Sequence, residues 1–365
     1  LGSRRGPSRQ RSCQIASLPG RLRNEFNPDH ALLSRVAPGP GKGEDLERFP
    51  EGVLKPAFQE RYRKLMGSEY ELFLRFMATR PIPSIRLNPM KADPHRLRKR
   101  LESRGWRLEQ IPWYDFGFWV LRGPERLGAT PEHQLGLYYV QEAASMVPPV
   151  ALDPQPRERV LDLAAAPGSK TTQMAEMMGW RGVILANDSN LGRANALSAN
   201  IQRMGCPNVV VTVRDGRILP KILSSRRFDR VLVDAPCSAV GEARRSWGAL
   251  KRWSLRAVRR ISRLQKSLAL AGYRLLKKGG LMVYSTCTLD PEENEFVVLS
   301  LLREGAELVR PEILNLKARP GLTRWEDREL DPALSRALRI YPQDNDTQAF
   351  FVALIKKPLD AGGEC

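Results

Sequence analysis

The sequence predicts an α/β protein in which a doubly wound, mostly parallel sheet follows a smaller α+β module. From about residue 155 onward, short apolar segments of strand character alternate with longer helical segments, which is typical of such a sheet. Cys237 and Cys287 each follow an apolar strand segment, and a third strand breaks into a small-residue loop that contains Gly168. Because α/β proteins bind ligands at the carboxyl ends of their parallel strands, these three loops are expected to form one site.

Four regions are expected along the chain. Residues 1–50 are rich in Pro, Gly and Arg and lack periodicity, so they are interpreted as a basic, extended arm. Residues 51–150 are expected to form a helical and α+β module, residues 151–357 the α/β domain, and residues 358–365 a tail. No internal repeat is evident.

The spacing of apolar residues predicts the individual elements. One buried helical face is predicted within 55–78 from the spacing of Phe58, Tyr62, Leu65, Leu72 and Phe76. Strands are predicted at 84–88 and 118–121, with a basic helix at 95–104 between them. In the α/β domain, strands are predicted at 159–164, 183–187, 208–213, 229–234, 281–285 and 349–355. Helices are predicted there at 169–178, 190–204, 255–276 and 291–303.

The charge of the chain indicates a polyanionic partner. The 365 residues carry a formal net charge of +19 and have an isoelectric point near 10.1, an excess typical of proteins that bind nucleic acid. An acidic membrane surface is the lesser alternative, because no basic amphipathic helix with an aromatic face stands out. No apolar run approaches the roughly 18–20 residues that a membrane span needs, so no membrane partner is expected.

The residues expected to contact RNA are basic. They are Arg86, Arg98 and Lys99 in the first module, and Arg244, Arg245, Lys251 and Arg252 in the α/β domain. The second group lies in a segment, 243–289, that contains no Asp or Glu. Trp247 and Trp253 interleave with these charges, and either stack on bases or pack against the domain.

Cysteine and histidine usage excludes two common kinds of site. The five cysteines, at positions 13, 206, 237, 287 and 365, show no paired spacing, and only three histidines are present. A metal site and a disulfide framework are therefore not expected, and a reducing compartment fits best. Residues 1–24 contain several arginines and no acid, which is typical either of an organellar transit peptide or of an RNA-binding arm.

The loop at 164–169 is a candidate cofactor site. Its residues are small (Ala164, Ala165, Ala166, Pro167, Gly168 and Ser169), so the backbone can approach a ligand, and the amino terminus of a helix follows. Such loops also occur as plain packing solutions. The spacing differs from that of a P-loop and from Gly-x-Gly-x-x-Gly, so a tight phosphate cradle is not predicted.

Two aspartates extend this candidate site along the next strands. Asp188 ends the second strand about 20 residues after the loop, where an acid binds ribose hydroxyls. Asp215 ends the third strand and is placed to contact an adenine amino group. Each alone is also explained as a solvated loop acid or a helix cap, but the three features in order favour an adenosine without a triphosphate.

The two strand-end cysteines are candidate nucleophiles. A thiolate is a strong nucleophile, and the basic segment that begins near Ala243 is expected to favour ionisation of Cys237 and Cys287. The alternative for a single buried cysteine is an inert core thiol. Two cysteines at neighbouring strand ends argue against that alternative.

At these residues the chain resembles the NOL1/NOP2/Sun family of RNA cytosine-5 methyltransferases. The segment from Asp162 to Thr171 is similar to that family's S-adenosylmethionine loop, and Asp234-Ala-Pro-Cys237-Ser to its Asp-Ala-Pro-Cys motif. Ser285-Thr-Cys287-Thr, followed by Pro291-Glu-Glu-Asn-Glu295, resembles its Thr-Cys motif. The segments 138–145 and 350–353 are similar as well, and the resemblance covers roughly residues 80–357.

The resemblance implies a class I methyltransferase sheet with an RNA-recognition-like amino-terminal module and S-adenosyl-L-methionine as cofactor. It implies that Cys287 adds to C6 of cytosine, that Cys237 assists elimination, and that Asp234 and Lys170 hold and polarise the base. The residues implied to bind the cofactor are those of the loop 164–169, together with Lys170, Asp188, Arg193, Asp215 and Asp234.

This chain departs from the family pattern at two loops. Ala239 stands where a glycine usually follows Pro-Cys-Ser, and Ser246 stands where an acid often follows the Arg pair. Ala349 likewise replaces the common glycine before the double Phe. If Ala239 distorts its loop, Cys237 is mispositioned while the nucleophile Cys287 is unaffected.

Three alternatives to an RNA methyltransferase differ in class. A DNA cytosine-5 methyltransferase is expected to show Phe-x-Gly-x-Gly and Glu-Asn-Val, which are absent. An rRNA-binding ribosome-assembly factor with little activity needs none of the four residues Lys170, Asp234, Cys237 and Cys287. The net charge disfavours a small-molecule methyltransferase.

The partner and the compartment are also expectations. The expected partner is RNA, with rRNA in a ribosomal particle favoured over tRNA and a protein partner as a further source of specificity. The absence of a carboxyl-terminal PUA-like extension and the arginine-rich start favour a mitochondrial location, with a cytoplasmic or nucleolar one as the alternative.

Overall fold

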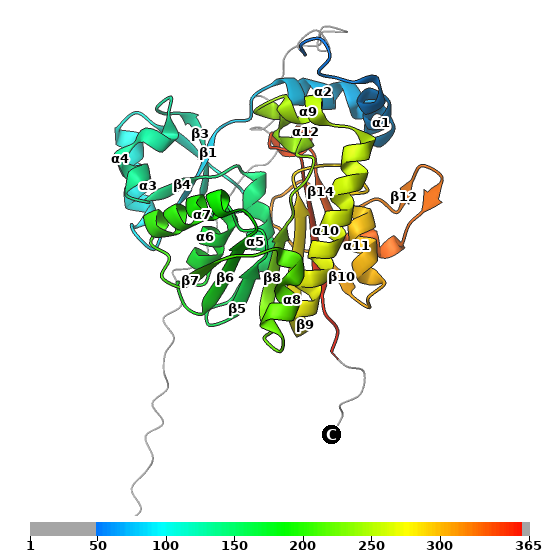
Figure 1. The fold of residues 1–365 in the computed structure, drawn as a ribbon. Coiled ribbons are helices and arrows are strands. Elements are labelled where there is room, and N and C mark those ends of the chain that lie inside the picture. The colour runs from blue at the N-terminus through cyan, green and yellow to red at the C-terminus, as the bar shows by residue number, and fades with distance from the viewer. Residues whose placement is uncertain (1–48, 360–365) are drawn as a thin grey trace, which may run out of the picture. The chain divides into compact units, whose positions relative to one another are not determined.

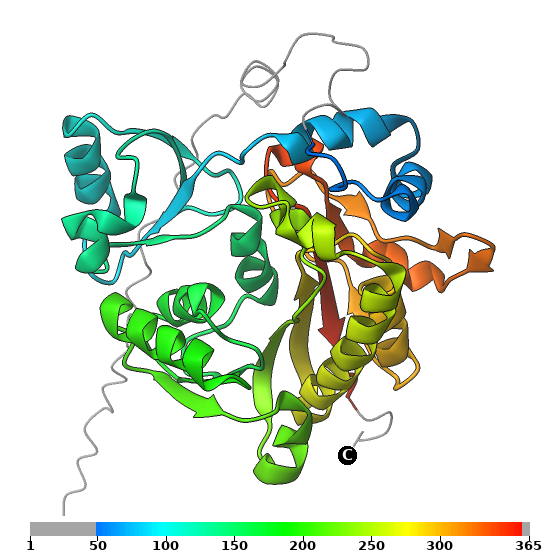
Figure 2. The same ribbon diagram turned by 45° about the horizontal axis from the view of Figure 1, so that its top comes forward.

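The computed structural model describes residues 49–359. The predicted arm at 1–50, the proposed transit peptide and most of the predicted tail at 358–365 lie outside this range. Figure 1 shows the order of the elements, and Figure 2 shows the same ribbon turned by 45°. Among the described helices, none combines the length and the apolar composition that crossing a membrane requires.

A nine-stranded sheet carries the α/β domain (Figure 1). Five parallel strands lie in the order β9-β8-β5-β6-β7, with β5 at Arg159–Asp162, β6 at Val183–Asp188, β7 at Val209–Val213, β8 at Phe228–Asp234 and β9 at Leu276–Thr286. Their predicted positions are confirmed, although β9 begins earlier than expected. The order places β5 and β8 side by side at the middle of the sheet, so their loops open at the same edge.

The other side of β9 is antiparallel, which the sequence did not predict. Strand β15 (Phe350–Lys356) pairs antiparallel with β9, and β14 (Leu338–Ile340), β11 (Arg319–Pro320) and β10 (Glu307–Val309) complete the sheet. A separate hairpin joins β12 (Arg324–Trp325) and β13 (Arg328–Glu329). Except for β15, these strands have two or three residues, too few to show a period of two.

Helices cover both faces of the sheet (Figure 1). One face packs against α5 (Val147–Leu152), α6 (Ser169–Met177) and α7 (Leu191–Met204); the other packs against α8 (Leu219–Leu223), α10 (Leu255–Leu275) and α11 (Glu295–Leu302). Met174 and Leu197 belong to the first core, and Leu268 and Tyr273 to the second. Two separate apolar cores on one sheet are the doubly wound architecture that the alternation of strands and helices predicted.

The amino-terminal module is a four-stranded antiparallel sheet in the order β2-β3-β1-β4. Its strands are β1 (Ser84–Leu87), β2 (Arg107–Gln110), β3 (Gly117–Arg122) and β4 (Tyr138–Val140), and its helices are α3 (Pro94–Ser103) and α4 (Pro131–Gln134). Asp93 caps α3 by accepting a hydrogen bond from the backbone N–H of Arg96, with Pro94 at the first helical position. The predicted strands β1 and β3 and helix α3 are confirmed, whereas β2 and β4 were missed.

The predicted helical region at 55–78 forms two helices, α1 (Pro56–Met66) and α2 (Tyr70–Ala78), joined by a short 3₁₀ turn. Phe58, Tyr62 and Phe73 pack together with Trp253 and Tyr341 in one core. The helix pair also contacts α12 (Pro342–Asn345) and the 3₁₀ helix η5 (Val240–Arg244). The α1–α2 pair therefore supports the segments that follow the two cysteine-bearing strands.

Candidate active site

The small-residue loop between β5 and α6 has the conformation that its composition predicts. Gly168 has φ +105°, and a Cβ added there would lie 2.9 Å from Cδ1 of Leu197. Ala165 donates its backbone N–H to the carbonyl of Asn187 at 2.7 Å, which ties the loop to the end of β6. Only a residue without a side chain combines that φ with that close approach.

Asp188 and Arg193 close this loop from the side of β6 and α7. The Asp188 carboxylate accepts hydrogen bonds from the backbone N–H groups of Ala166, at 3.3 Å, and Asn190, at 3.0 Å. Arg193 lies 3.4 Å from the same carboxylate and donates to the carbonyl of Ala166 at 2.6 Å. Both residues named from the sequence as cofactor ligands therefore lie at the loop.

Asp215 has a local role in the structure. It caps the turn after β7 by accepting from the backbone N–H and the guanidinium of Arg217, and both side chains are exposed. The Arg217 hydrogen bond is the main reason that the pKa of Asp215 lies below its usual range. The adenine contact expected of Asp215 remains a prediction.

Asp162, at the carboxyl end of β5, is suited to a cationic ligand group. One of its oxygens accepts from Thr171 Oγ1 at 2.7 Å, while Oδ1 has no hydrogen-bond partner within residues 49–359. Burial raises the pKa of this carboxyl to about 7. A buried carboxyl oxygen without a donor, beside a loop that a Cβ would obstruct, fits the amino-acid part and the adenosine of S-adenosylmethionine.

Lys170 and Asp234 form an ion pair across the strand ends. Lys170 Nζ lies 2.7 Å from Asp234 Oδ2 and donates to Ser145 Oγ at 2.9 Å. Ser285 Oγ donates to the other Asp234 oxygen at 2.7 Å. Burial lowers the pKa of Lys170, but the facing Asp234 carboxylate outweighs burial and keeps the pKa above its ordinary value. Lys170 is therefore a cation at the centre of the site.

The two thiols lie side by side. Strands β8 and β9 are parallel neighbours with Asp234 opposite Ser285, so each strand delivers its cysteine to the same place. The Sγ atoms of Cys237 and Cys287 are 3.0 Å apart. The prediction that these loops converge is confirmed.

The expectation that basic neighbours favour the Cys287 thiolate is wrong for this arrangement. The hydrogen bond with Cys237, burial, and the negative charges of Glu242 and Asp234 raise the pKa of Cys287 well above its ordinary value. The arginines of the acid-free segment do not offset this, because Arg256, Arg259, Arg260 and Arg263 lie on the exposed face of α10. Sequence counts of charge did not reveal which charges face the sulfur.

One turn holds both cysteine loops. Glu293 Oε2 accepts from the backbone N–H of Ser238, next to Cys237, and from Gln265 Nε2, both at 2.9 Å. Asn294 accepts from Thr286 Oγ1 at 2.6 Å and donates to the carbonyl of Thr288 at 3.0 Å, on either side of Cys287. In the sequence this Pro-Glu-Glu-Asn-Glu segment was recognisable only as part of a motif, and its contacts with both loops were not predicted.

Ala239 occupies a position that favours glycine. Its φ is +58° and its ψ +32°, in the left-handed region, at the start of η5, which costs an alanine about 1 kcal/mol. The loop nevertheless closes: Gly241 donates its N–H to the carbonyl of Cys287 at 2.8 Å. The distortion considered for Cys237 is thus limited to local strain.

Two of the residues named as RNA contacts are buried, which corrects those predictions. Arg86 is fully buried and binds Glu176, Thr172 and the carbonyl of Ser169, so it joins the module to α6. Arg244 is buried and binds Thr79, Asp346 and the carbonyl of Thr347. Both cations are held by the fold and present little surface to a ligand.

The remaining basic candidates are accessible. Lys99, Arg245, Lys251 and Arg252 are exposed, and Arg98 is partly exposed beside Glu102. Trp253 is buried and donates a hydrogen bond to Asp290, so of the two alternatives it packs against the domain and does not stack on a base. Trp247 is partly buried, with its ring 5.8 Å from that of Phe49.

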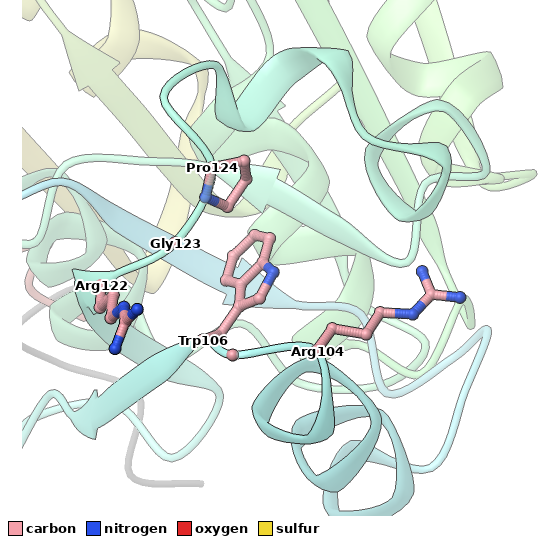
Figure 3. A pocket seen from close by; sticks show the side chains of 6 residues that line it. Arg104, Trp106, Arg122, Gly123 and Pro124 are labelled. Atoms are coloured by element: carbon pink, nitrogen blue, oxygen red, sulfur yellow. The ribbon is translucent and has the colours of Figure 1, made fainter.

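Figure 3 shows a depression of about 330 Å³ on the amino-terminal module, with Trp106 at its centre. Arg104, Arg122 and Pro124 contribute to its lining. No residue of the Cys237–Cys287 site lines it, so it is separate from the chemistry. Among residues 49–359, no group of three or more His, Cys, Asp or Glu side chains could hold a metal ion.

Comparison with known families decides the class. The family described as 16S rRNA methyltransferase RsmB/F matches residues 149–356, and the N-terminal domain of 16S rRNA methyltransferase RsmF matches residues 54–143. The chain belongs to this family of S-adenosylmethionine-dependent RNA cytosine-C5 methyltransferases. The resemblance found in the sequence is confirmed, and so are the enzyme class and the cofactor.

Two curated relatives have different RNA substrates in their names. A tRNA (cytosine(49)-C(5))-methyltransferase from Pyrococcus abyssi is 46% identical over 300 residues, which are 82% of this chain and 95% of that protein. The ribosomal RNA small subunit methyltransferase F from Shewanella amazonensis is 43% identical over 277 residues, 75% of this chain. The chain spans only 58% of that second protein's length.

Solved structures share the fold. A methyltransferase homolog protein from Pyrococcus horikoshii has a TM-score of 0.77 and 35% identity, covering 86% of this chain and 99% of its own. NSun6 from Pyrococcus horikoshii, solved with the S-adenosylmethionine analogue SFG, has a TM-score of 0.74 and 25% identity. That comparison covers 86% of this chain and all of the other. Class I methyltransferase architecture is therefore confirmed.

Proposed function

We propose that this chain methylates C5 of a cytosine in RNA through a covalent adduct between Cys287 and C6 of the base, with rRNA as the substrate. The observation that carries the proposal is the pair of thiols 3.0 Å apart, in the same site as the Lys170–Asp234 ion pair. A scaffold that only bound RNA would need neither the second thiol nor the buried cation.

S-adenosylmethionine, when bound at the loop 164–169 with Asp162, Asp188 and Arg193, supplies an electrophilic methyl group. The chain must make C5 of cytosine nucleophilic, because an aromatic ring carbon is not. The Cys287 thiolate does this by forming a bond from sulfur to C6, which moves the C5–C6 electron pair onto C5. Asp234 accepts a hydrogen bond from the exocyclic amine and, with Lys170, orients the ring.

Cys237 serves the second half of the reaction. Once C5 carries the methyl group, its hydrogen must leave as a proton so that the C5–C6 double bond reforms and the bond from Cys287 to C6 breaks. Cys237, adjacent to Cys287, is placed to assist this elimination and the release of product. A base enters these loops only when it is unpaired or flipped out of a helix.

Two considerations separate the RNA substrates. The match to both families described as 16S rRNA methyltransferases supports rRNA within a ribosomal particle, whereas the net charge of +19 fits any RNA. The second candidate is tRNA, which is favoured by the 46% identity over 95% of an archaeal tRNA enzyme. A protein partner that adds specificity and a mitochondrial location remain predictions, the latter resting on residues outside 49–359.

The test is transfer of labelled methyl from S-adenosylmethionine to separate pools of rRNA, tRNA and partly assembled ribosomal particles. We expect position-resolved 5-methylcytosine in one rRNA, no transfer by Cys287→Ser, and a stable protein–RNA adduct with Cys237→Ala. Labelling of tRNA alone would show that tRNA, and not rRNA, is the substrate. An inactive Cys237→Ala without adduct would overturn the assigned roles, and no transfer by the wild type to any pool would favour an assembly factor.

A further inference from the structure

A buried arginine ties the turn after Cys237 to the segment that enters the amino-terminal module. Arg244, the last residue of η5, donates to the carbonyl of Thr79 at 3.1 Å and to Thr79 Oγ1 at 3.3 Å. The same guanidinium donates to the carbonyl of Thr347 at 2.9 Å and to Asp346 at 2.6 Å. Thr79 and Arg244 are thus held together although 165 positions separate them in the chain.

The next residue on each segment is an exposed arginine. Arg80 follows Thr79 and Arg245 follows Arg244, and both line one depression of about 290 Å³ with Pro81 and Pro83. Proline fixes its own φ, which makes the wall formed by Pro81 and Pro83 stiff. The buried contact of Arg244 therefore determines where two exposed cations meet.

Within the described part of the chain, neither Arg80 nor Arg245 forms an ion pair. Burial raises the pKa of Glu142, and the nearby charge of Arg245 offsets part of that rise. The two oxygens of Glu142, however, already accept hydrogen bonds from the backbone N–H groups of Ser145 and Gln348. Two guanidinium groups that share a depression without a paired carboxylate repel each other, which an anion between them would relieve.

The depression adjoins the catalytic loops. Gly241, four residues before Arg245, donates to the carbonyl of Cys287, and Glu242 Oε1 lies 3.9 Å from Cys287 Sγ. Arg245 thus follows, by four and three positions, two residues that contact Cys287. Glu142, whose pKa is raised by burial and lowered in part by the charge of Arg245, is linked to the Lys170–Asp234 ion pair through Ser145. The backbone N–H of Ser145 donates to Glu142, and its hydroxyl accepts from Lys170.

We propose that Arg80 and Arg245 hold a backbone phosphate of the RNA directly next to the target cytosine. Two planar guanidinium groups suit the oxygens of a phosphodiester, which accept several charge-assisted hydrogen bonds at once. A base is a poor occupant, because the lining contains no aromatic ring, unlike the depression around Trp106. The inference rests on the proposed RNA methylation and adds a subsite that orients the strand.

The test uses Arg80→Gln, Arg245→Gln and the double variant with a short RNA centred on the methylated cytosine. Each single variant is expected to weaken RNA binding about tenfold, the worth of a hydrogen bond to a charged group. The slope of log Kd against log salt is expected to fall by about 0.7, for one phosphate of a single strand. The affinity for S-adenosylmethionine should change little, because neither arginine contacts the loop 164–169, Asp188 or Arg193.

Arg226→Gln is the matched control. Arg226 is an exposed arginine just before β8, at the edge of the sheet opposite Cys237, and its loss removes the same charge. A second measurement replaces single phosphates of the RNA by neutral methylphosphonates. At one position next to the cytosine, this replacement should weaken wild-type binding and leave the double variant's binding unchanged.

Equal weakening by Arg226→Gln and Arg80→Gln would overturn the subsite in favour of general charge. The absence of any phosphate position whose neutralisation cancels the difference between wild type and double variant would overturn it as well. Failure of the proposed function looks different, because the wild type would then transfer no methyl group to RNA at all.

Discussion

Helix α6 carries two ion pairs, and their surroundings differ. Lys170 in its first turn pairs with Asp234 at 2.7 Å, and Glu176 in its last turn pairs with Arg86 at 2.6 Å. The side chains of Arg86 and Glu176 are 0% and 3% exposed, whereas those of Lys170 and Asp234 are 10% and 28% exposed. One pair is sealed between two parts of the fold, and the other opens to a ligand.

The partners of each pair follow this difference. Glu176 also accepts from Tyr114 Oη at 2.7 Å, and Arg86 also donates to Thr172, so protein groups take up most of the bonding capacity. Burial raises the pKa of Glu176 to about 7, although Arg86 lowers it. Such a pair joins the module to the catalytic domain, and its side chains expose almost no surface to which a ligand could bind.

The Lys170–Asp234 pair can form further hydrogen bonds. Each member has one hydroxyl partner besides the other, Ser145 for Lys170 and Ser285 for Asp234, and the Asp234 carboxylate remains partly exposed. A carboxylate can accept more hydrogen bonds than the two it receives here. The same chemical pair therefore stabilises the fold when it is sealed, and under the proposed mechanism it binds substrate when one member stays accessible.

Replacing the cation of the accessible pair should have the largest effect on chemistry. Lys170→Met is expected to reduce methyl transfer about 10²–10³-fold, because a preorganised charge at the reacting base is lost. The free energy of unfolding should change little, because Asp234 keeps its bond with Ser285 and its contact with water. Single-turnover transfer and urea denaturation measure the two effects. A large loss of stability with a normal transfer rate would contradict the different roles given to the two ion pairs.

The same substitution in the sealed pair should act on stability instead. Arg86→Met is expected to lower the free energy of unfolding by about 3 kcal/mol at pH 8, because a buried carboxylate loses its counter-ion. Arg86 lowers the pKa of Glu176, so without it this pKa rises and Glu176 takes up a proton. The variant's deficit should therefore shrink as pH falls, since neither protein holds a charged Glu176 in acid.

Urea denaturation of Arg86→Met and wild type at several pH values checks this expectation. The folded fraction of the variant should retain RNA affinity and transfer, in contrast to Lys170→Met. A specific loss of RNA binding in well-folded Arg86→Met would restore the original prediction that Arg86 contacts RNA.

The smallest effect is expected at the exposed edge of the accessible site. The negative charge of Glu242 helps to raise the pKa of Cys287, so Glu242→Gln should lower that pKa. Because the thiolate forms as pH rises through this pKa, the acid side of the rate profile should move to lower pH. Rates measured below the wild-type optimum should rise a few-fold. A pH profile of single-turnover transfer measures this shift, and movement to higher pH would contradict the role of Glu242.

Local patterns in the sequence were sufficient to predict the parallel half of the sheet and the convergence of the two cysteines at its edge. The apolar runs before Asp234 and Ser285 identified two strands, and a parallel sheet brings their cysteines together whatever else the chain does. The loop with Gly168 was recognisable because a φ of +105° demands that residue type. The antiparallel strands between 307 and 340 could not be recognised in the sequence, because pairing partners rather than periodicity determine strands of two or three residues.

Tertiary structure alone decided what each charge does. Arg86, Arg244 and Arg245 are the same residue type in basic segments, yet two are buried in ion pairs and one is exposed. Their partners, Glu176 and Asp346, lie 90 and 102 positions away in the chain. The same holds for the residues that raise the pKa of Cys287. A strand or helix is encoded by neighbours along the chain, whereas the energy of a charge depends on burial and on groups that only folding brings near.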